Sequence, residues 1–339
     1  MLLDFWYPVS FSSELGRRPQ RVTALGRELV VWRTRSGRVS VLSDLCVHRG
    51  AALSQGRVQG EEIACSYHGW RYRTDGSCAA IPAQPRRAVP AKARLDAYPV
   101  TERFGIVWAF LGELPEEQRP PLPEWPEYDR PGTRRIQGEF SWAAHVDRVV
   151  EGGLDYAHGP FVHRGTFGRF MAPEVEDFEV QAGEWSGRAS DDGLGGLAWF
   201  LPSSTLTDLD FGTSRQMILQ AHLPVDADRT RTFWVSVRDY ATTPLADGVV
   251  RLLDHLVLRE DRRVVEALRP ELLPFDLSDE LHVRSDALQV AYRRRRRELI
   301  ASGWPVVGDP VGQGPARVLP SPARRDTGLA RAWVHRAGV

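Results

Sequence analysis

Two short loops that each carry one cysteine and one histidine constrain this chain more than any other feature of its sequence. Cys46 and His48 form a Cys-x-His motif, and after sixteen further residues Cys65 and His68 form a Cys-x-x-His motif. Structural zinc sites usually pair their cysteines closely and group their histidines separately. The interleaved order instead suits a centre of two irons, in which two thiolates hold one iron and two imidazoles hold the other. The sequence therefore predicts a region that folds around such a centre.

This is the ligand set of a Rieske [2Fe–2S] cluster. We expect Cys46, His48, Cys65 and His68 to be its ligands, with a structural zinc site as the alternative. A glycine ends each loop, which suits tight turns whose backbone N–H groups point at cluster sulfides. The third cysteine, Cys78, lies beyond both loops and is expected to be a buried small residue.

Composition is typical of a globular protein that keeps its cysteines reduced. The 339 residues are 42% hydrophobic and 26% charged, which is enough for one large domain or two ordinary ones. Three cysteines are too few for a disulfide framework, and a net charge of zero argues against nucleic acid or a membrane surface as the main partner. The longest apolar run, residues 106–111, is far shorter than the roughly 20 residues that span a bilayer. Since the first residues also lack a secretory pattern, we expect a soluble cytoplasmic protein.

The pattern of the chain changes along its length. Short alternating segments separated by Gly- and Asp-containing turns fill the first third, which indicates strands and hairpins. A stretch rich in proline and charge follows, and later segments show helical periodicity, with helices expected at about 146–158, 248–268 and 286–303. We expect a small antiparallel β domain at 1–115, a linker at 116–132, a second domain at 133–303 and an irregular or loosely docked tail at 304–339.

The second domain contains an array of one aspartate and two histidines. Asp155, His158 and His163 form a D-x-x-H-x-x-x-x-H pattern. Residues three apart share a helix face, so Asp155 can hydrogen-bond the His158 ring. Residues five apart diverge by about 140° on a helix. We therefore expect the Gly159-Pro160 step to end the helix and to turn His163 back toward the same point.

Two histidines need a carboxylate to complete the facial triad of non-haem Fe(II) oxygenases, which leaves positions open for O₂. The helix expected at 248–268 has an apolar stripe, and Asp261 lies on it. A carboxylate on a buried face needs a partner, and a metal ion is a natural one. We expect Asp261 to join His158 and His163, with Asp254 and Asp286 as the alternatives.

Both motifs, in this order and at this separation, resemble the α subunit of Rieske non-haem iron oxygenases. The similar stretches include CVHRGAALSQG, CSYHGWRY, RYRTDGSCAAIPA, LREDRRVVEALRP and SDALQVAYRRR. Within the family, the chain is similar to the α-only branch that holds vanillate O-demethylase, dicamba demethylase and the saxitoxin-pathway hydroxylases. The resemblance implies an α+β fold, with a small antiparallel β Rieske domain and a larger catalytic domain whose curved antiparallel sheet is flanked by helices. It also supports Asp261, which matches the aspartate of the family's Glu-Asp pair.

The resemblance implies an oxygenase component that uses O₂ and a mononuclear Fe(II) site to monooxygenate a small organic substrate, by hydroxylation or oxidative demethylation. The chain has no Gly-x-Gly-x-x-Gly signature, so NAD(P)H is expected to act only through a separate reductase, with or without a ferredoxin. In the family, the cluster of one subunit lies beside the iron of its neighbour in a head-to-tail trimer. We therefore expect a homotrimer in which Asp155 bridges His158 and His68 of the adjacent chain. One departure is Gly152, where the family often has asparagine.

Two alternatives stay open at this point. A Rieske electron-transfer protein without catalytic iron is the alternative function. The five-arginine run at 293–297 is expected to be a solvated helix face, and the alternative is a docking site for an acidic ferredoxin.

Overall fold

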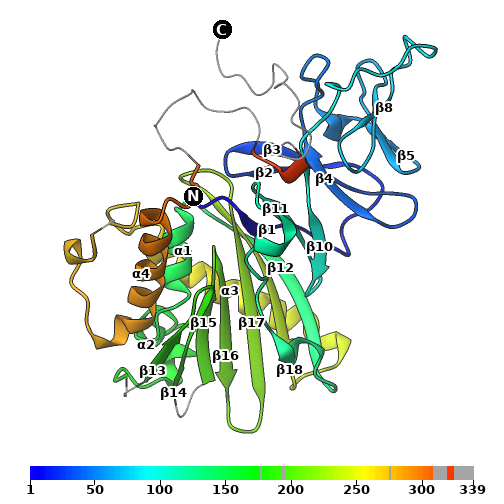
Figure 1. The fold of residues 1–339 in the computed structure, drawn as a ribbon. Coiled ribbons are helices and arrows are strands. Elements are labelled where there is room, and N and C mark those ends of the chain that lie inside the picture. The colour runs from blue at the N-terminus through cyan, green and yellow to red at the C-terminus, as the bar shows by residue number, and fades with distance from the viewer. Residues whose placement is uncertain (176–177, 192–194, 275, 308–318, 324–339) are drawn as a thin grey trace. The chain divides into compact units, whose positions relative to one another are not determined.

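The structure is a computed structural model that describes residues 1–175, 178–191, 195–274, 276–307 and 319–323. The chain divides into two compact units (Figure 1). The first comprises Met1–Pro120 and Pro305–Val339, and the second comprises Pro121–Trp304. The boundaries at 115, 132 and 303 remain predictions, but the residues after Trp304 group with the first unit.

The first unit is built from three small antiparallel sheets, as expected for a small antiparallel β domain. Their strand orders are β1-β11-β10, β2-β3-β4-β9 and β5-β6-β7-β8. The strands are β1 (Phe5–Phe11), β2 (Gln20–Ala24), β3 (Arg27–Arg33), β4 (Val39–Ser43), β5 (Arg57–Gln59), β6 (Glu62–Ala64), β7 (Arg71–Tyr72), β8 (Cys78–Ala80), β9 (Ala97–Tyr98), β10 (Val100–Arg103) and β11 (Ile106–Leu111).

The predicted Asp-Gly hairpin lies between β7 and β8, which pair antiparallel. Gly76 in its turn has a φ of +81°, and a Cβ there would overlap the Leu95 carbonyl oxygen, so the turn requires glycine. One apolar cluster of this unit contains Trp32, Tyr72, the cysteines of both loops and Cys78. Cys78 is buried as predicted, and the core holds both cysteine loops in place.

Residues near the end of the chain return to the first unit. The Tyr98 hydroxyl donates to the Leu319 carbonyl at 2.9 Å, and the Ser321 hydroxyl donates to the Asp96 carboxylate at 2.7 Å. Leu319 and Ser321 are both buried. Of the predicted tail, irregular or loosely docked, Leu319 and Ser321 are therefore firmly docked, and most of the tail lies outside the described residues.

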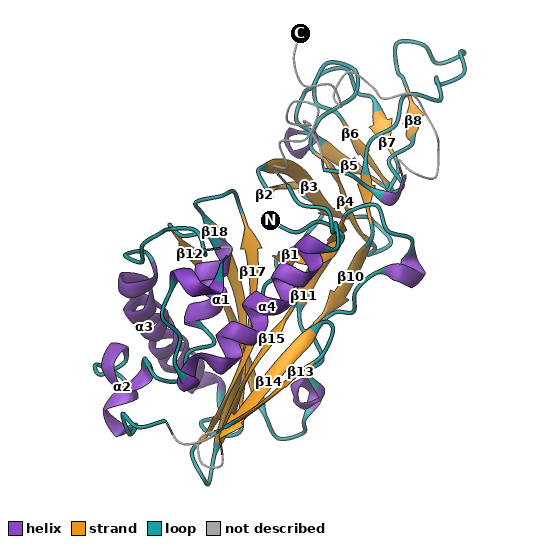
Figure 2. Ribbon diagram, turned by 60° about the vertical axis from the view of Figure 1, so that its left-hand side comes forward, coloured by secondary structure: helices purple, strands orange, loops and turns teal. Residues whose placement is uncertain are grey.

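The second unit contains a seven-stranded antiparallel sheet with helices against one face (Figure 2). Its order is β12-β18-β17-β16-β15-β14-β13; α1 contacts β17, α3 contacts β12, and α4 contacts β13 and β14. The predicted α+β class is confirmed. The strands are β12 (Arg134–Trp142), β13 (Glu179–Ala182), β14 (Ser186–Asp191), β15 (Gly195–Phe200), β16 (Ser204–Asp210), β17 (Arg215–Pro224) and β18 (Thr230–Arg238), and the helices are α1 (Val146–Gly152), α2 (Gly159–Val162), α3 (Asp247–Val265) and α4 (Ala287–Ala301).

The long helix α3 is the one predicted at 248–268, and its buried residues are Val250, Leu258 and Val265. Its first residue, Asp247, accepts hydrogen bonds from Arg134 at 2.6 Å and from Arg238 at 2.7 Å. An acidic residue is favourable there because it faces the positive end of the helix dipole. Across the described parts of the chain, no helix combines the length and the apolar character needed to cross a membrane.

The helix expected at 146–158 is shorter than predicted. α1 ends at Gly152, and Gly159 and Pro160 begin α2 instead of ending a helix. Proline suits the first turn of a helix because the N–H it lacks would have no intrahelical partner there. His158 is therefore the residue that precedes α2, and it does not share a continuous helix with Asp155.

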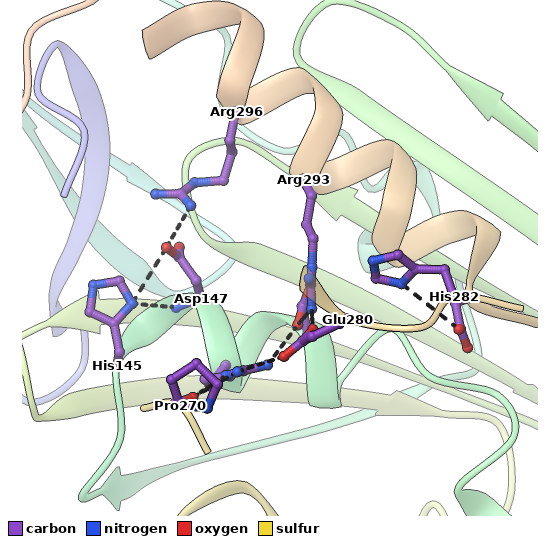
Figure 3. Close-up of polar contacts among 10 residues, drawn as sticks. His145, Asp147, Pro270, Glu280, His282, Arg293 and Arg296 are labelled. Carbon is purple, nitrogen blue, oxygen red and sulfur yellow. Dashed lines mark hydrogen bonds and ion pairs between the residues drawn. The ribbon is translucent and has the colours of Figure 1, made fainter. Parts of the chain in front are cut away.

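Two arginines of the 293–297 run, one buried and one half-buried, pair with acidic residues of α1 (Figure 3). Arg293 is 7% exposed and donates to Glu151 at 2.7 Å and to Glu280 at 2.6 Å. Arg296 pairs with Asp147 at 2.5 Å. The expectation of a solvated face is wrong for both arginines, because residues three apart share one face of α4 and that face meets α1.

Candidate metal centres and substrate cavity

His158, His163 and Asp261 converge on one point in the second unit. The Nε2 atoms of the two histidines are 3.0 Å apart. The Asp261 Oδ1 atom lies 3.1 Å from His163 Nε2 and 3.4 Å from His158 Nε2. One possible ligand atom from each residue lies within 4.8 Å of the other two. A single ion with bonds of about 2 Å could bind all three.

A one-turn helix and a long helix bring these groups together. His158 precedes α2 and His163 follows it, so one short turn spans their five-residue separation. Asp261 comes from α3. A Cβ at Gly159 would lie 2.7 Å from the end of the flexible Met171 side chain, so a larger residue directly after His158 would require that side chain to move.

The other two aspartates considered for the third ligand lie elsewhere. Asp254 Oδ1 accepts a hydrogen bond from Gln216 Nε2 at 2.9 Å, and burial raises the pKa of Asp254 to about 6. Asp286 accepts from the Val283 backbone N–H at 2.8 Å. Of the three aspartates, the structure brings Asp261 to the histidines.

Burial and the contacts with the two histidines act in opposite directions on the pKa of Asp261. Burial raises the pKa of Asp261, but its contacts with His158 and His163 outweigh burial and leave the pKa below its usual range. An ionised carboxylate beside two imidazoles is the donor set of non-haem ferrous sites, and three protein ligands leave further positions open. The residues therefore fit a mononuclear iron.

Two residues that the sequence did not indicate, Glu260 and Thr166, support His163 at its Nδ1 atom. Glu260 Oε2 lies 3.0 Å from His163 Nδ1, and the Thr166 hydroxyl donates to the same oxygen at 2.8 Å. A carboxylate that accepts from Nδ1–H fixes the ring and leaves Nε2 for a metal. The signal in the sequence was an acidic residue next to Asp261, but only the fold shows that it reaches His163.

Asp155 lies beside His158 without a direct hydrogen bond. Its Oδ2 atom is 3.8 Å from His158 Nδ1, and its Oδ1 atom accepts from the Ala157 N–H at 2.8 Å. Among the described residues, His158 Nδ1 has no hydrogen-bond partner. The hydrogen bond expected from helical spacing is replaced by a longer contact because α1 ends before Asp155.

Gly152, the position where the family often has asparagine, lies against α3. A Cβ at this position would be 2.9 Å from a methyl group of Val265. Real Cβ atoms almost never approach another atom this closely, so a larger residue would require Val265 to move. Glycine thus allows the end of α1 to approach α3.

The four predicted cluster residues lie in two similar loops of the first unit. The Gly50 N–H donates to the Cys46 carbonyl at 2.8 Å, and the Gly69 N–H donates to the Cys65 carbonyl at 3.0 Å. Both glycines have positive φ values, +71° and +69°, which favours glycine at each turn. The two loops therefore present their side chains in the same way.

The side chains of these loops form a thiol pair and an imidazole pair. The Nδ1 atoms of His48 and His68 are 3.1 Å apart, and the His48 ring stacks on Trp70 at 4.6 Å between centroids. Both loop cysteines are buried; burial raises the pKa of Cys46 to about 11, and its Sγ lies 3.1 Å from the Tyr72 hydroxyl. A buried thiol ionises readily only beside a cation. The residues fit a [2Fe–2S] cluster.

A cavity of about 520 Å³ adjoins the triad in the second unit. His158, His163 and Asp261 all line it. Its volume is in the range of sites for small organic ligands, which are mostly apolar with a few polar groups. The apolar lining includes Leu197, Ile218, Trp234, Val250, Leu253 and Val257.

Comparisons with known proteins agree with this geometry. The Rieske [2Fe-2S] domain family matches residues 5–99, and the vanillate O-demethylase oxygenase C-terminal domain family matches residues 192–302. Methylxanthine N3-demethylase NdmB of Pseudomonas putida is 30% identical over 328 residues, which cover 89% of this chain and 90% of NdmB. The chain belongs to the Rieske oxygenase α subunits.

Other relatives of this Rieske oxygenase subunit extend the comparison. Methylxanthine N1-demethylase NdmA of Pseudomonas putida is 28% identical over 322 residues, which cover 88% of this chain and 89% of NdmA. A solved structure of NdmA superposes with a TM-score of 0.79 over 88% of this chain and 92% of that one. Dicamba monooxygenase bound to dicamba has a TM-score of 0.75 at 22% identity, over 89% of this chain and 99% of that one, and shares the fold.

The Rieske oxygenase subunit is accordingly an oxidoreductase that has a Rieske [2Fe–2S] cluster and a mononuclear iron and that uses O₂. It is an oxygenase component that works with a separate reductase on a small-molecule substrate. The comparisons give no support to an electron-transfer protein without catalytic iron.

Proposed function

We propose that His158, His163 and Asp261 hold one ferrous ion and that the subunit monooxygenates a small organic molecule in the adjoining cavity. The convergence of three ligand atoms within 4.8 Å of one another carries this proposal. When bound, the iron supplies O₂ activation and the cluster supplies the electrons. Glu260 holds the His163 ring in place, and the apolar cavity wall excludes water from the reacting carbon.

Oxidative demethylation is the reaction that the relatives favour. NdmA and NdmB, which match along nearly their whole length, are methylxanthine N-demethylases, whereas phenoxybenzoate dioxygenase subunit α matches over 37% of this chain. We propose that one oxygen atom of O₂ enters a C–H bond of an N-methyl or O-methyl group. The hydroxymethyl product then releases formaldehyde and leaves N–H or O–H. Two electrons and two protons reduce the other oxygen atom to water.

The cluster ligands we propose are Cys46 and Cys65 for one iron and His48 and His68 for the other. The buried thiols and the paired imidazoles support this division. The free cysteines also suit a cytoplasmic location. Electrons are proposed to come from the reductase with or without a ferredoxin.

We also propose a homotrimer in which Asp155 joins His158 to His68 of the adjacent chain. Asp155 and His158 line a second cavity, of about 230 Å³, whose rim includes Leu281. The Leu281 side chain is 93% exposed, and His68 is exposed in the first unit, so both are available to another subunit. A carboxylate can accept hydrogen bonds from two imidazoles, each through the nitrogen that does not bind metal.

Iron analysis tests the mononuclear site. The wild-type protein is expected to hold about three irons per chain, two in the cluster and one at the triad. His163→Ala should hold about two and keep the cluster absorption. His255→Ala, elsewhere on α3, is the matched control and should keep all three. A wild-type protein with a full cluster and no third iron would contradict the proposal.

The reaction is tested by O₂ uptake and formaldehyde release with a surrogate reductase. The panel consists of N-methyl and O-methyl aromatic compounds and their ethyl or unmethylated analogues. O₂ uptake that depends on the methylated compound, with one formaldehyde per turnover, is the expected result. Oxygen insertion into the ring without formaldehyde would overturn demethylation while leaving monooxygenation in place.

A further inference from the structure

The cavity beside the triad contains a side-chain amide that the protein itself does not use. Gln220 lies on β17 and lines the cavity. Its side chain is half-buried, and its amide makes no hydrogen bond to any residue within the described parts of the chain. A polar group without a protein partner in a mostly apolar cavity is available to a ligand.

Gln216, on the same face of β17, is fully occupied. Its Nε2 donates to Ser236 Oγ and to Asp254 Oδ1, each at 2.9 Å, and its Oε1 accepts from the Tyr240 hydroxyl. Residues four apart on a strand point the same way, so both glutamines face the cavity. Gln216 is therefore part of the cavity wall, and the Gln220 amide is available to a ligand.

Gln220 lies on the part of β17 next to the end of α1, from which the chain continues to Asp155 and His158. In the sheet it pairs with Thr205, and a Cβ at Gly153, just past the end of α1, would be 3.2 Å from the Thr205 hydroxyl. Gln216 instead contacts α3 at a point about 10 Å along the helix from Asp261. A small ligand held by Gln220 can therefore place a carbon near the metal ligands.

The chemistry of the cavity favours a neutral ligand with a donor beside an acceptor. A carboxamide offers one N–H and one C=O side by side, and it pairs through two hydrogen bonds with an edge that presents the complementary groups. Among the described lining residues there is one arginine, Arg169, which is exposed, and four aspartates. Among these lining residues, therefore, no buried arginine or lysine is available to pair with a carboxylate ligand. The aspartates are Asp155, Asp208, Asp254 and Asp261.

We propose that Gln220 selects substrates by pairing with a lactam or imide edge, an N–H next to a C=O, on a small planar heterocycle. This inference rests on the proposed function, because it names the substrate class of the same cavity. Gln220 would act as a specificity residue: it touches the substrate at the edge that is not oxidised.

Two matched pairs of heterocycles test the inference by isothermal titration calorimetry on the iron-loaded protein. Theobromine has an N–H between two carbonyls, and in caffeine a methyl group replaces that hydrogen. The second pair is 2-quinolone and N-methyl-2-quinolone. Two neutral hydrogen bonds correspond to about a 5- to 150-fold difference in affinity, so we expect each N–H compound to bind more tightly by such a factor.

Variants of Gln220 test whether this side chain causes the tighter binding of the N–H compounds. Gln220→Met should remove the preference and leave the affinity for the N-methyl compounds within about twofold, since Met has similar length and no amide. Gln220→Leu replaces it if the Met variant does not fold. Gln181→Met, exposed on β13, is the matched control and should keep the preference.

Equal affinities within each pair would overturn the inference, as would a preference that survives in the Gln220 variant. Failure of both N–H compounds to bind at millimolar concentration would overturn it as well. Affinity and not turnover is measured, so theobromine that binds tightly but releases no formaldehyde from its N-methyl groups would support the role of Gln220 and count against the proposed reaction.

Discussion

Single side chains behind the triad determine how firmly its ligands are held. Glu260 contacts both His163 and Thr166 through one oxygen, and His163 is only 3% exposed. Partners of this kind orient a ligand and raise its basicity. Iron retention, more than folding, should therefore depend on Glu260.

Glu260→Ala is expected to lower the iron affinity of the triad by about 10- to 100-fold, because His163 loses the acceptor that orients it. The measurement is the iron retained after dialysis against graded chelator, with cluster absorption as an internal reference. Glu271→Ala removes an exposed glutamate paired with Arg269 and should retain iron as the wild type does. Equal retention in both variants would contradict the role of Glu260.

Gly152→Asn is expected to lower the free energy of unfolding by about 1–3 kcal/mol, because the new Cβ would meet a methyl group of Val265. Chemical denaturation measures the change. Gly248→Asn is the control, since a Cβ there has open space around it. Adding Val265→Ala to the Gly152 variant should recover part of the loss, and no recovery would mean that this contact is not the cause.

Among the elements, α1 and α4 are joined by buried ion pairs that the sequence did not reveal. Arg293 connects Glu151 on α1 with Glu280 (Figure 3). Arg148 also donates to Glu280, at 2.9 Å, so two arginines share this carboxylate. The segment that contains Glu280 also borders the cavity lined by Asp155, and the pairs therefore hold both sides of that cavity.

Arg293→Met is expected to lower the free energy of unfolding by about 3–5 kcal/mol, because it leaves the Glu151 carboxylate buried without its main partner. Arg294→Met is the matched control one residue along α4, where the side chain is exposed, and should change stability by less than about 0.5 kcal/mol. Urea denaturation distinguishes the two. Similar values for both variants would show that the buried pair contributes little.

The sequence predicted the elements better than their contacts. The range of α3 was close to the one expected because an apolar stripe marks a helix over its whole length, and α4 was also close to its expected range although five arginines fill its middle. α1 was predicted too long because a glycine pair at 152–153 ends it where the pattern continues. The 293–297 run shows why contacts are harder: a run of charge looks the same whether it is solvated or paired.

In the candidate site, the metal ligands could be predicted from the sequence, but the residues around them could not. Metal coordination restricts residue type and spacing, so the two histidines and the aspartate stood out as motifs. Glu260 is 97 residues from His163, and no local pattern links them. Gln220 gave no signal either, because it differs from Gln216 only in the fold, where its amide has no hydrogen-bond partner among the described residues.

At the scale of the whole molecule, each compact unit contains one of the two candidate metal centres, and the first unit uses residues from both ends of the chain. Leu319 and Ser321 are buried in it, and Ser321 provides a hydrogen bond to Asp96, which is 4% exposed. These residues are part of the unit that holds the cluster loops.

A chain truncated after Trp304 is expected to lose its cluster at a lower temperature than the full chain. Exposing one buried leucine costs about 1.5–3 kcal/mol, and the loss of the hydrogen bond from the Ser321 hydroxyl to the Asp96 carboxylate adds to this. Cluster absorption followed during heating is the measurement. A chain that ends at Ala323 keeps these contacts and should behave like the full protein. Identical melting of the 1–304 chain would show that the returning residues do not stabilise this unit.

This return of the chain affects how the protein can be made and recombined. A ribosome synthesises residues 319–323 after the whole second unit, so the cluster-bearing unit cannot be complete until the second unit has been made. A chimera that exchanges only the first 120 residues between relatives would join parts that have not evolved together. Such an exchange should therefore carry the returning residues with it.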